Sequence, residues 1–252
     1  MSLRIYLTGR LDIETDGALV NLRSLPGRQG RRALAYLICE RDHPTPREVL
    51  ADAIWQDALP PAWDTALRAI VSRLRRLCTN LGRSEAATIS SAFGCYQLYL
   101  PLDTWIDIEA ATASVAQAEA ALRNGAVRDA WGHALVASVI AERPFLPGEE
   151  GPWVEQRRAE LHRIHVRALE CVADLRLAIG EGALAVEAAS EAVRLEPFRE
   201  TGYERLMRAH AALGNRAEAL RTYERCRRLL ADELGADPSA AIEALYLELL
   251  RQ

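Results

Sequence analysis

Hydrophobic and polar positions alternate at the start of the chain. Residues 3–8 and 11–15 switch between apolar and polar side chains at every step, which predicts two half-buried strands. Asp16 and Gly17 form a turn signal, and residues 18–22 can return as a third strand. The chain is therefore expected to open with a small antiparallel meander.

The period then changes to that of a helix. Residues 29–41 place four apolar side chains on one stripe and predict a first helix. Thr45 is a suitable N-cap for a second helix, Pro46 suits the first helical position, and Glu48 completes a capping box. This helix is expected to stop before the two prolines in residues 58–61.

A third helix begins at Asp64 or Thr65 and runs to about Asn80. Its apolar positions fall on one face: Leu67, Ile70, Val71, Leu74 and Leu77. Its candidate contact residues occupy the opposite face and its flank: Thr65, Arg68, Ser72, Arg73, Arg75 and Arg76. From Thr65 to Ser84 there are five arginines and no acid, whereas a solvated helix usually mixes signs. A helix face that carries only positive charge is suited to bind a row of phosphate groups. The alternative interpretation is an ordinary basic surface exposed to solvent.

Two β-prone runs follow the third helix. They lie on either side of Phe93, Gly94 and Cys95 within residues 88–100, which predicts a hairpin. Two helices with a short connector, a basic amphipathic helix and a hairpin are the parts of a helix-turn-helix with a wing.

From residue 105 onwards the pattern is helical almost without interruption. Helices are expected at about 107–123, 126–141, 152–179, 183–195, 199–213, 216–233 and 239–250. Gly180 and Gly214 lie 34 residues apart, and each follows an Ala- and Leu-rich helix, as in tetratricopeptide repeats. We expect a boundary near residues 101–104, giving domains at 1–104 and 105–252. A single continuous domain is the alternative.

The residue composition limits the reactions and the metal or redox sites that this chain can support. All 31 basic residues are Arg, so any reaction that needs a lysine amine is excluded. Residues 1–104 contain 13 Arg against 11 acids, and residues 105–252 contain 18 Arg against 24 acids. The five cysteines include no CxxC pair, which argues against a zinc knuckle or a redox pair.

Motifs for catalysis, cofactors and metals are missing. There is no nucleophile elbow, no HExxH and no glycine fingerprint, so no catalytic residue, cofactor or metal ligand is expected. His162 and His165 are three apart on a helix, and a solvated helix explains them better than a metal. Without a membrane-length apolar stretch or a long signal core, a cytoplasmic protein with no membrane contact is expected.

Two sets of residues resemble known families. The order of elements, residues 70–77 and the run Gly94-Cys95-Tyr96 resemble the OmpR-type winged helix. That family usually has an Arg shortly before the Gly-x-Tyr turn, where this chain has Ser90-Ser91-Ala92. The resemblance therefore leaves DNA contacts of the wing to Ser90, Ser91 and the upstream Arg83.

The second half is similar to the bacterial transcriptional activator domain. The matching segments are residues 220–238, Trp105-Ile106-Asp107, Trp153 with Arg157-Arg158-Leu161, and residues 196–200. Taken together, residues 3–250 resemble the small SARP class, the antibiotic regulatory protein family of transcriptional activators. The expected fold is an α+β winged helix-turn-helix followed by an all-α, tetratricopeptide-like domain, mainly α overall.

The SARP resemblance implies a regulator that binds direct repeats of double-stranded promoter DNA and recruits RNA polymerase holoenzyme. It implies a bacterial cytoplasmic protein at the nucleoid, and a homodimer on DNA is compatible with direct repeats. Because the chain ends at Gln252, it also implies a stand-alone form without the added domains of larger relatives.

Three other functions stay open at this point. The first is a helical-repeat adaptor whose winged helix binds protein, and the second is a regulator that senses a ligand in the repeat domain. The third is an enzyme, which the missing motifs disfavour.

Overall fold

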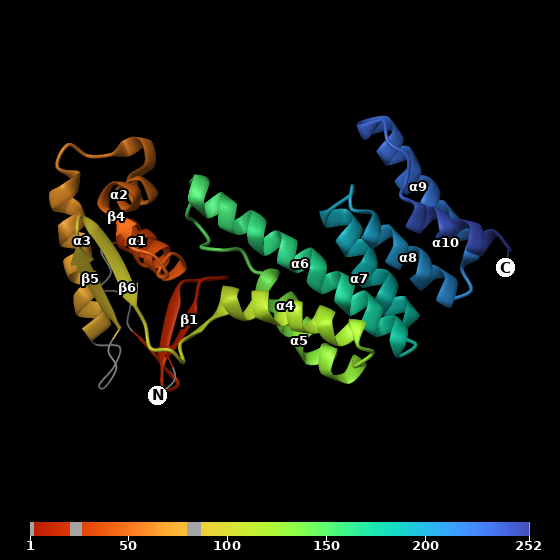
Figure 1. Cartoon of the computed structure of the whole chain (residues 1–252), viewed down its shortest axis with the longest axis horizontal. Helices are drawn as coiled ribbons and strands as arrows, with labels where there is room; N and C mark the ends of the chain where they lie inside the picture. The colour runs from red at the N-terminus through yellow and green to blue at the C-terminus, as the bar shows by residue number, and fades with distance from the viewer. Residues whose placement is uncertain (1–2, 21–26, 80–86, 252) are drawn as a thin grey trace. The chain divides into compact units, whose positions relative to one another are not determined.

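The computed structural model describes residues 3–20, 27–79 and 87–251 (Figure 1). It divides into two compact units, the first formed by residues 1–109 and 143–160 and the second by residues 110–142 and 161–252. The strands are β1 (Leu3–Tyr6), β2 (Asp12–Thr15), β3 (Ala18–Leu19), β4 (Thr45–Pro46), β5 (Thr88–Ala92), β6 (Cys95–Tyr99) and β7 (Trp105–Ile106). The helices of the first part are α1 (Gly27–Cys39), α2 (Arg47–Trp55), the short 3-10 helix η2 (Gln56–Ala58) and α3 (Trp63–Thr79). Those that follow are α4 (Asp107–Arg123), α5 (Val127–Ala141), α6 (Pro152–Ala178), α7 (Gly182–Leu195), α8 (Glu200–Ala212), α9 (Arg216–Leu234) and α10 (Ala240–Arg251).

The first sheet confirms the predicted meander and adds one strand to it. Its order is β3-β2-β1-β7, with antiparallel pairs between β1 and β2 and between β2 and β3. In β1 the side chains of Leu3 and Ile5 are buried and that of Arg4 is exposed, as the alternation predicts. The added strand, β7, pairs in parallel with β1 through Ile106 opposite Ile5.

A buried carboxylate fixes the residues that follow β7. Oδ2 of Asp107 accepts hydrogen bonds from the backbone N–H of Leu7 at 2.9 Å, from that of Thr8 at 2.8 Å and from the Thr8 hydroxyl at 2.8 Å. Its Oδ1 accepts from the N–H of Ile108, inside the first turn of α4. These bonds compensate the carboxylate for its lost solvation, and they tie the start of α4 to Leu7 and Thr8, directly after β1.

The three helices α1, α2 and α3 bury the predicted apolar stripes. Ala33, Leu34, Leu37 and Ile38 of α1 are all buried. The predicted capping box at the start of α2 is wrong. Thr45 is buried in β4 and Pro46 is the N-cap, with no side-chain cap hydrogen bond. Thr45 pairs instead with Tyr96 of β6, so a strand-strand contact takes the place of the local cap.

The predicted hairpin is confirmed. β5 and β6 are antiparallel, and their register ends with Ala92 opposite Cys95. β4 joins them in a three-stranded sheet of order β4-β6-β5, and β5 packs beside α3 (Figure 1).

The chain returns to the first unit through residues 143–160. Phe145 forms an isolated bridge with Thr8, and the carboxylate of Glu149 is buried against α1. Its Oε2 accepts from Nε of Arg32 at 2.6 Å and from Nε of Arg28 at 2.8 Å. Nη1 of Arg32 also donates to the carbonyl of Ile54, so one buried guanidinium joins α1, α2 and the returning segment.

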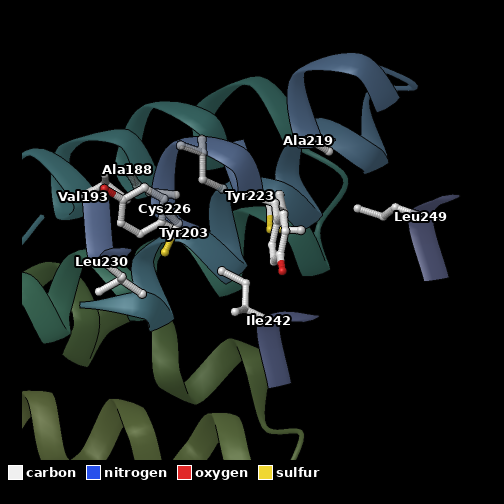
Figure 2. Packing of buried hydrophobic residues seen from close by; sticks show 13 residues of the cluster. Ala188, Val193, Tyr203, Ala219, Tyr223, Cys226, Leu230, Ile242 and Leu249 are labelled. Atoms are coloured by element: carbon white, nitrogen blue, oxygen red, sulfur yellow. The ribbon is translucent and has the colours of Figure 1, made fainter. Parts of the chain in front are cut away.

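The second unit is helical in the part of the chain that is described. Ala118 of α4, Ala134 of α5 and Leu175 of α6 are buried in one cluster. A larger cluster joins α6 to α10, and Figure 2 shows Tyr203, Tyr223 and Cys226 gathered in it. Gly180 follows α6 and Gly214 follows α8, at φ values of +79° and +74°, which a glycine adopts without strain. The fold is a mixed α/β region followed by helices, as predicted, and no described helix is long and apolar enough to cross a membrane.

Candidate nucleic-acid interface

The two faces of α3 are separated as the sequence predicts. Leu67, Ile70, Val71, Leu74 and Leu77 are buried and face α1, α2 and β5. Cys78 continues this face, and burial raises the pKa of its thiol to about 11. The buried stripe therefore fixes which side of the helix remains open to solvent.

The open side holds six of the nine candidate contact residues. Their side chains are all exposed, and they are Thr65, Arg68, Ser72, Arg73, Arg75 and Arg76. The helix thus brings four guanidinium groups to one surface, with two hydroxyl groups beside them. Arg83, the seventh candidate, lies outside the described residues.

One acidic side chain does lie at this surface, and it belongs to Asp64, the residue directly before the acid-free stretch from Thr65 to Ser84. Nη2 of Arg68 lies 2.5 Å from Oδ2 of Asp64, one turn earlier in α3. Oδ1 of Asp64 also lies 3.6 Å from Nη1 of Arg47, at the start of α2. Arg47 therefore belongs to the same charged surface, and sequence reasoning missed it because the two residues are far apart in the chain.

Arg75 has a different environment from the other arginines. Its Nε donates to the backbone carbonyl of Ile89 in β5 at 2.9 Å. Among the described residues, Arg73 and Arg76 have no ion pair or hydrogen bond with a protein group. Arg73 also lines a pocket of about 820 Å³ together with Arg28 and Arg32 of α1. Arg75 thus links α3 to the hairpin, while Arg73 and Arg76 have guanidinium groups without a partner among the described residues.

The hairpin supplies the last two candidates. Ser91 is exposed and Ser90 is half-buried, both on β5. The side chain of Tyr96 is buried in β6, and the guanidinium of Arg47 lies 5.6 Å from its ring centre. Hydroxyl groups and backbone N–H groups of such a hairpin can donate to phosphate oxygens.

Nothing in the described part of the chain suggests a metal centre. Among those residues, no three His, Cys, Asp or Glu side chains are grouped so that they could hold an ion. Nε2 of His162 lies 3.2 Å from Oε1 of Glu196, so this histidine has a carboxylate neighbour in the helical unit.

Comparisons with known proteins cover almost the whole chain. Residues 106–250 match the model of the bacterial transcriptional activator domain. The chain is 30% identical over 249 residues to the transcriptional regulatory protein EmbR of Mycobacterium tuberculosis, covering 98% of this chain and 63% of that protein. It is also 30% identical over 223 residues to the regulatory protein AfsR of Streptomyces coelicolor, covering 88% of this chain and 22% of AfsR.

A solved structure agrees with these sequence matches. The structure of M. tuberculosis EmbR in complex with a low affinity phosphopeptide superposes with a TM-score of 0.85 at 27% identity. The match covers 99% of this chain and 65% of that one. The chain therefore spans about a fifth of AfsR and less than two thirds of EmbR.

Proposed function

We propose that the chain binds double-stranded DNA in a sequence-specific way through α3 and the β5–β6 hairpin. It belongs to the family defined by the bacterial transcriptional activator domain and is a transcriptional regulator of the AfsR and EmbR type. The SARP resemblance seen in the sequence is confirmed at the level of the family. The proposed role is regulatory and not catalytic, because the similar proteins are themselves regulators.

One observation supports the proposal most directly: the exposed face of α3 presents Arg68, Arg73, Arg75 and Arg76, with Asp64 as its one described acid. Arg forks bind phosphate oxygens and the O6 and N7 atoms of guanine in the same geometry. A helix with this face, preceded by α2 and a short connection, has the arrangement of a recognition helix in the major groove.

The proposed roles differ among the residues. Arg68 and Ser72 are assigned to base edges, and Arg73 and Arg76 to phosphates. Thr65, Ser90 and Ser91 are assigned to the DNA backbone, and Arg83 keeps the DNA contact that the OmpR-type resemblance leaves to it. Arg75 is assigned both a structural role and a DNA contact, because its Nε donates to the carbonyl of Ile89 while its side chain is exposed.

The remaining steps of regulation are also proposals. Residues 1–104 would bind DNA, and residues 105–252 would support assembly on promoter direct repeats, as a homodimer, and recruit RNA polymerase holoenzyme. The protein would then act in the bacterial cytoplasm, at the nucleoid.

Selection from a pool of randomised duplexes tests the proposed function. The whole chain should enrich a defined sequence, and a gel shift with that duplex should weaken steeply as salt rises. An adaptor that binds only protein would enrich no sequence and show no salt-steep shift, and that result would overturn the proposal. In vitro transcription with purified polymerase then tests activation, which should require both the enriched sequence and the protein.

A further inference from the structure

The pocket that Arg73 lines extends well beyond the proposed DNA interface. It lies between α1, the end of α2, η2, α3 and the returning residues 143–160, and its volume is about 820 Å³. All of these segments belong to the first compact unit. Sites for small molecules usually have volumes of about 300–1,000 Å³, so the pocket is large enough for a ligand of nucleotide size.

The lining of this pocket is positively charged. Arg28 and Arg32 of α1 and Arg73 of α3 bring three guanidinium groups to it. The acid among its lining residues is Glu150, whose side chain is exposed. Glu149 is buried and accepts hydrogen bonds from both arginines of α1. Three guanidinium groups beside two carboxylates leave an excess of positive charge, which favours an anion.

The three arginines differ in how many of their donors are engaged. Nε, Nη1 and Nη2 of Arg32 donate to protein acceptors at 2.6, 3.0 and 2.7 Å. Arg28 uses Nε and Nη2 in the same way, and its Nη1 has no partner among the described residues. Arg73 has no described partner at all. The pocket thus has unused guanidinium donors on both α1 and α3, and such donors suit phosphate oxygens.

Gln56 forms a fixed part of the pocket wall. Its φ is +52°, which is strained for a residue with a side chain. Its Nε2 donates to the carbonyl of Glu150 at 2.6 Å, and a Cβ atom at Gly151 would overlap this amide. Ile54 and Trp55, directly before it, also line the pocket and are otherwise buried. Strained backbone held by its surroundings is common at ligand sites, and the apolar side chains suit an uncharged group.

We propose that this pocket binds a small organic phosphate. The phosphate group lies between Arg28 and Arg73, and the uncharged part of the ligand packs against Ile54 and Trp55. Because Arg73 is also assigned to a DNA phosphate, the ligand and DNA compete for one guanidinium, and bound ligand lowers the affinity for DNA. This last step alone rests on the proposed DNA-binding function.

Calorimetry with the whole chain tests ligand binding in the absence of DNA. Phenyl phosphate is compared with inorganic phosphate, and UDP with pyrophosphate, so that each organic probe has an anion-only counterpart. In at least one pair the organic probe should bind more tightly, because it also removes apolar surface from water.

A pair of matched substitutions then tests the role of the pocket arginine. Arg73→Gln should lower the affinity for that organic probe about tenfold, through the loss of a charge-assisted hydrogen bond. It should fold as the wild type does, since Arg73 has no described partner to lose. Arg4→Gln is the control, because Arg4 is an exposed arginine of β1 outside the pocket, and it should leave the affinity unchanged.

Another variant tests the space in the pocket without a change of charge. Ala58→Trp places a large side chain at an exposed position of the lining, in η2, and should abolish binding of the organic probe. Thermal unfolding checks that the variant is folded. Fluorescence anisotropy with the selected duplex then measures competition. A saturating organic probe should weaken DNA binding by the wild type and leave that of Ala58→Trp unchanged.

The possible failures are distinguishable. If neither organic probe binds more tightly than its counterpart, or if Arg73→Gln and Arg4→Gln bind it equally well, the pocket is not an organic phosphate site. If no probe binds and Ala58→Trp lowers the affinity for DNA, the pocket holds the DNA backbone instead. If an organic probe binds but leaves DNA affinity unchanged, the competition is wrong and the site stands. If the wild type binds no duplex, the proposed function fails, whereas the calorimetry still decides the pocket.

Discussion

Arg75 in α3 donates a hydrogen bond from Nε to the backbone carbonyl of Ile89 in β5, at 2.9 Å. This bond fastens the hairpin to the helix that presents the exposed arginines. A guanidinium on the proposed DNA-binding face therefore also has a structural task. The two tasks can be separated by experiment, because the neighbouring Arg76 is free of described protein partners.

Arg75→Ala should lower the free energy of unfolding by about 1 kcal/mol, because the carbonyl of Ile89 loses a hydrogen bond. Its DNA affinity should also fall, since the hairpin is held less firmly against α3. Urea unfolding followed by fluorescence measures the first effect. If the variant is as stable as the wild type, the bond to Ile89 contributes nothing.

Arg76→Ala should weaken binding to all duplexes to a similar degree and reduce the salt slope by about one, because one phosphate contact is lost. Its stability should not change. Arg228→Ala, an exposed arginine of α9, removes the same charge elsewhere and should leave the slope as it is. If Arg76→Ala and Arg228→Ala have the same salt slope, Arg76 does not contact DNA phosphates.

Arg68→Ala should relax base preference at one position of the site and cost about 1–3 kcal/mol there. Asp64→Asn should act in the opposite direction, because it frees Arg68 from its ion pair and removes an acid from the face. We expect affinity to rise by up to about fivefold, the range of an exposed ion pair. Titrations against the selected duplex and its single-base variants measure both. An Asp64→Asn protein that binds less tightly would mean that the ion pair positions Arg68 for DNA.

Glu149→Ala should destabilise the first unit by about 3–5 kcal/mol, because it leaves the buried guanidinium of Arg32 without its carboxylate. Glu150→Ala is the control, since the side chain of Glu150 is exposed and only its backbone carbonyl accepts from Arg32. Differential scanning calorimetry compares the two. Equal melting temperatures would show that residues 143–160 do not depend on this ion pair.

One of the five thiols should react quickly in the native protein. Burial raises the pKa of Cys39 and Cys171 to about 12 and that of Cys78 and Cys226 to about 11, so at pH 8 these thiols remain protonated. Because the thiolate is the nucleophile, Ellman's reagent should first modify the half-exposed Cys95. Cys95→Ser should abolish the fast phase, and duplex DNA should slow it. A fast phase that persists in Cys95→Ser would contradict the assignment.

Local patterns predicted the elements and the two faces of α3 well. Apolar spacing is decided by neighbours one turn apart, so the burial of Leu67, Ile70 and Leu74 follows from sequence alone. The separation of Arg68, Ser72 and Arg76 from that face follows in the same way. These features determine most of the candidate interface.

Long-range pairings could not be predicted. β7 is two residues long and pairs with β1 about a hundred residues away, which no local period encodes. Glu149 reads as an ordinary surface acid until the fold places it beside Arg32. Thr45 has the local chemistry of a helix cap, but its pairing with Tyr96 determines its role. In each case a tertiary contact outweighs the local preference.

The most direct test of DNA recognition by α3 is the affinity for the selected duplex and for a scrambled duplex, measured as a function of salt. The wild type should prefer the selected duplex by about 10³-fold or more at physiological salt. The variant with Arg68, Arg73 and Arg76 all changed to Ala should lose this preference and, because two phosphate contacts are lost, about two units of salt slope. If the triple variant keeps the wild-type preference and slope, α3 is not the recognition helix.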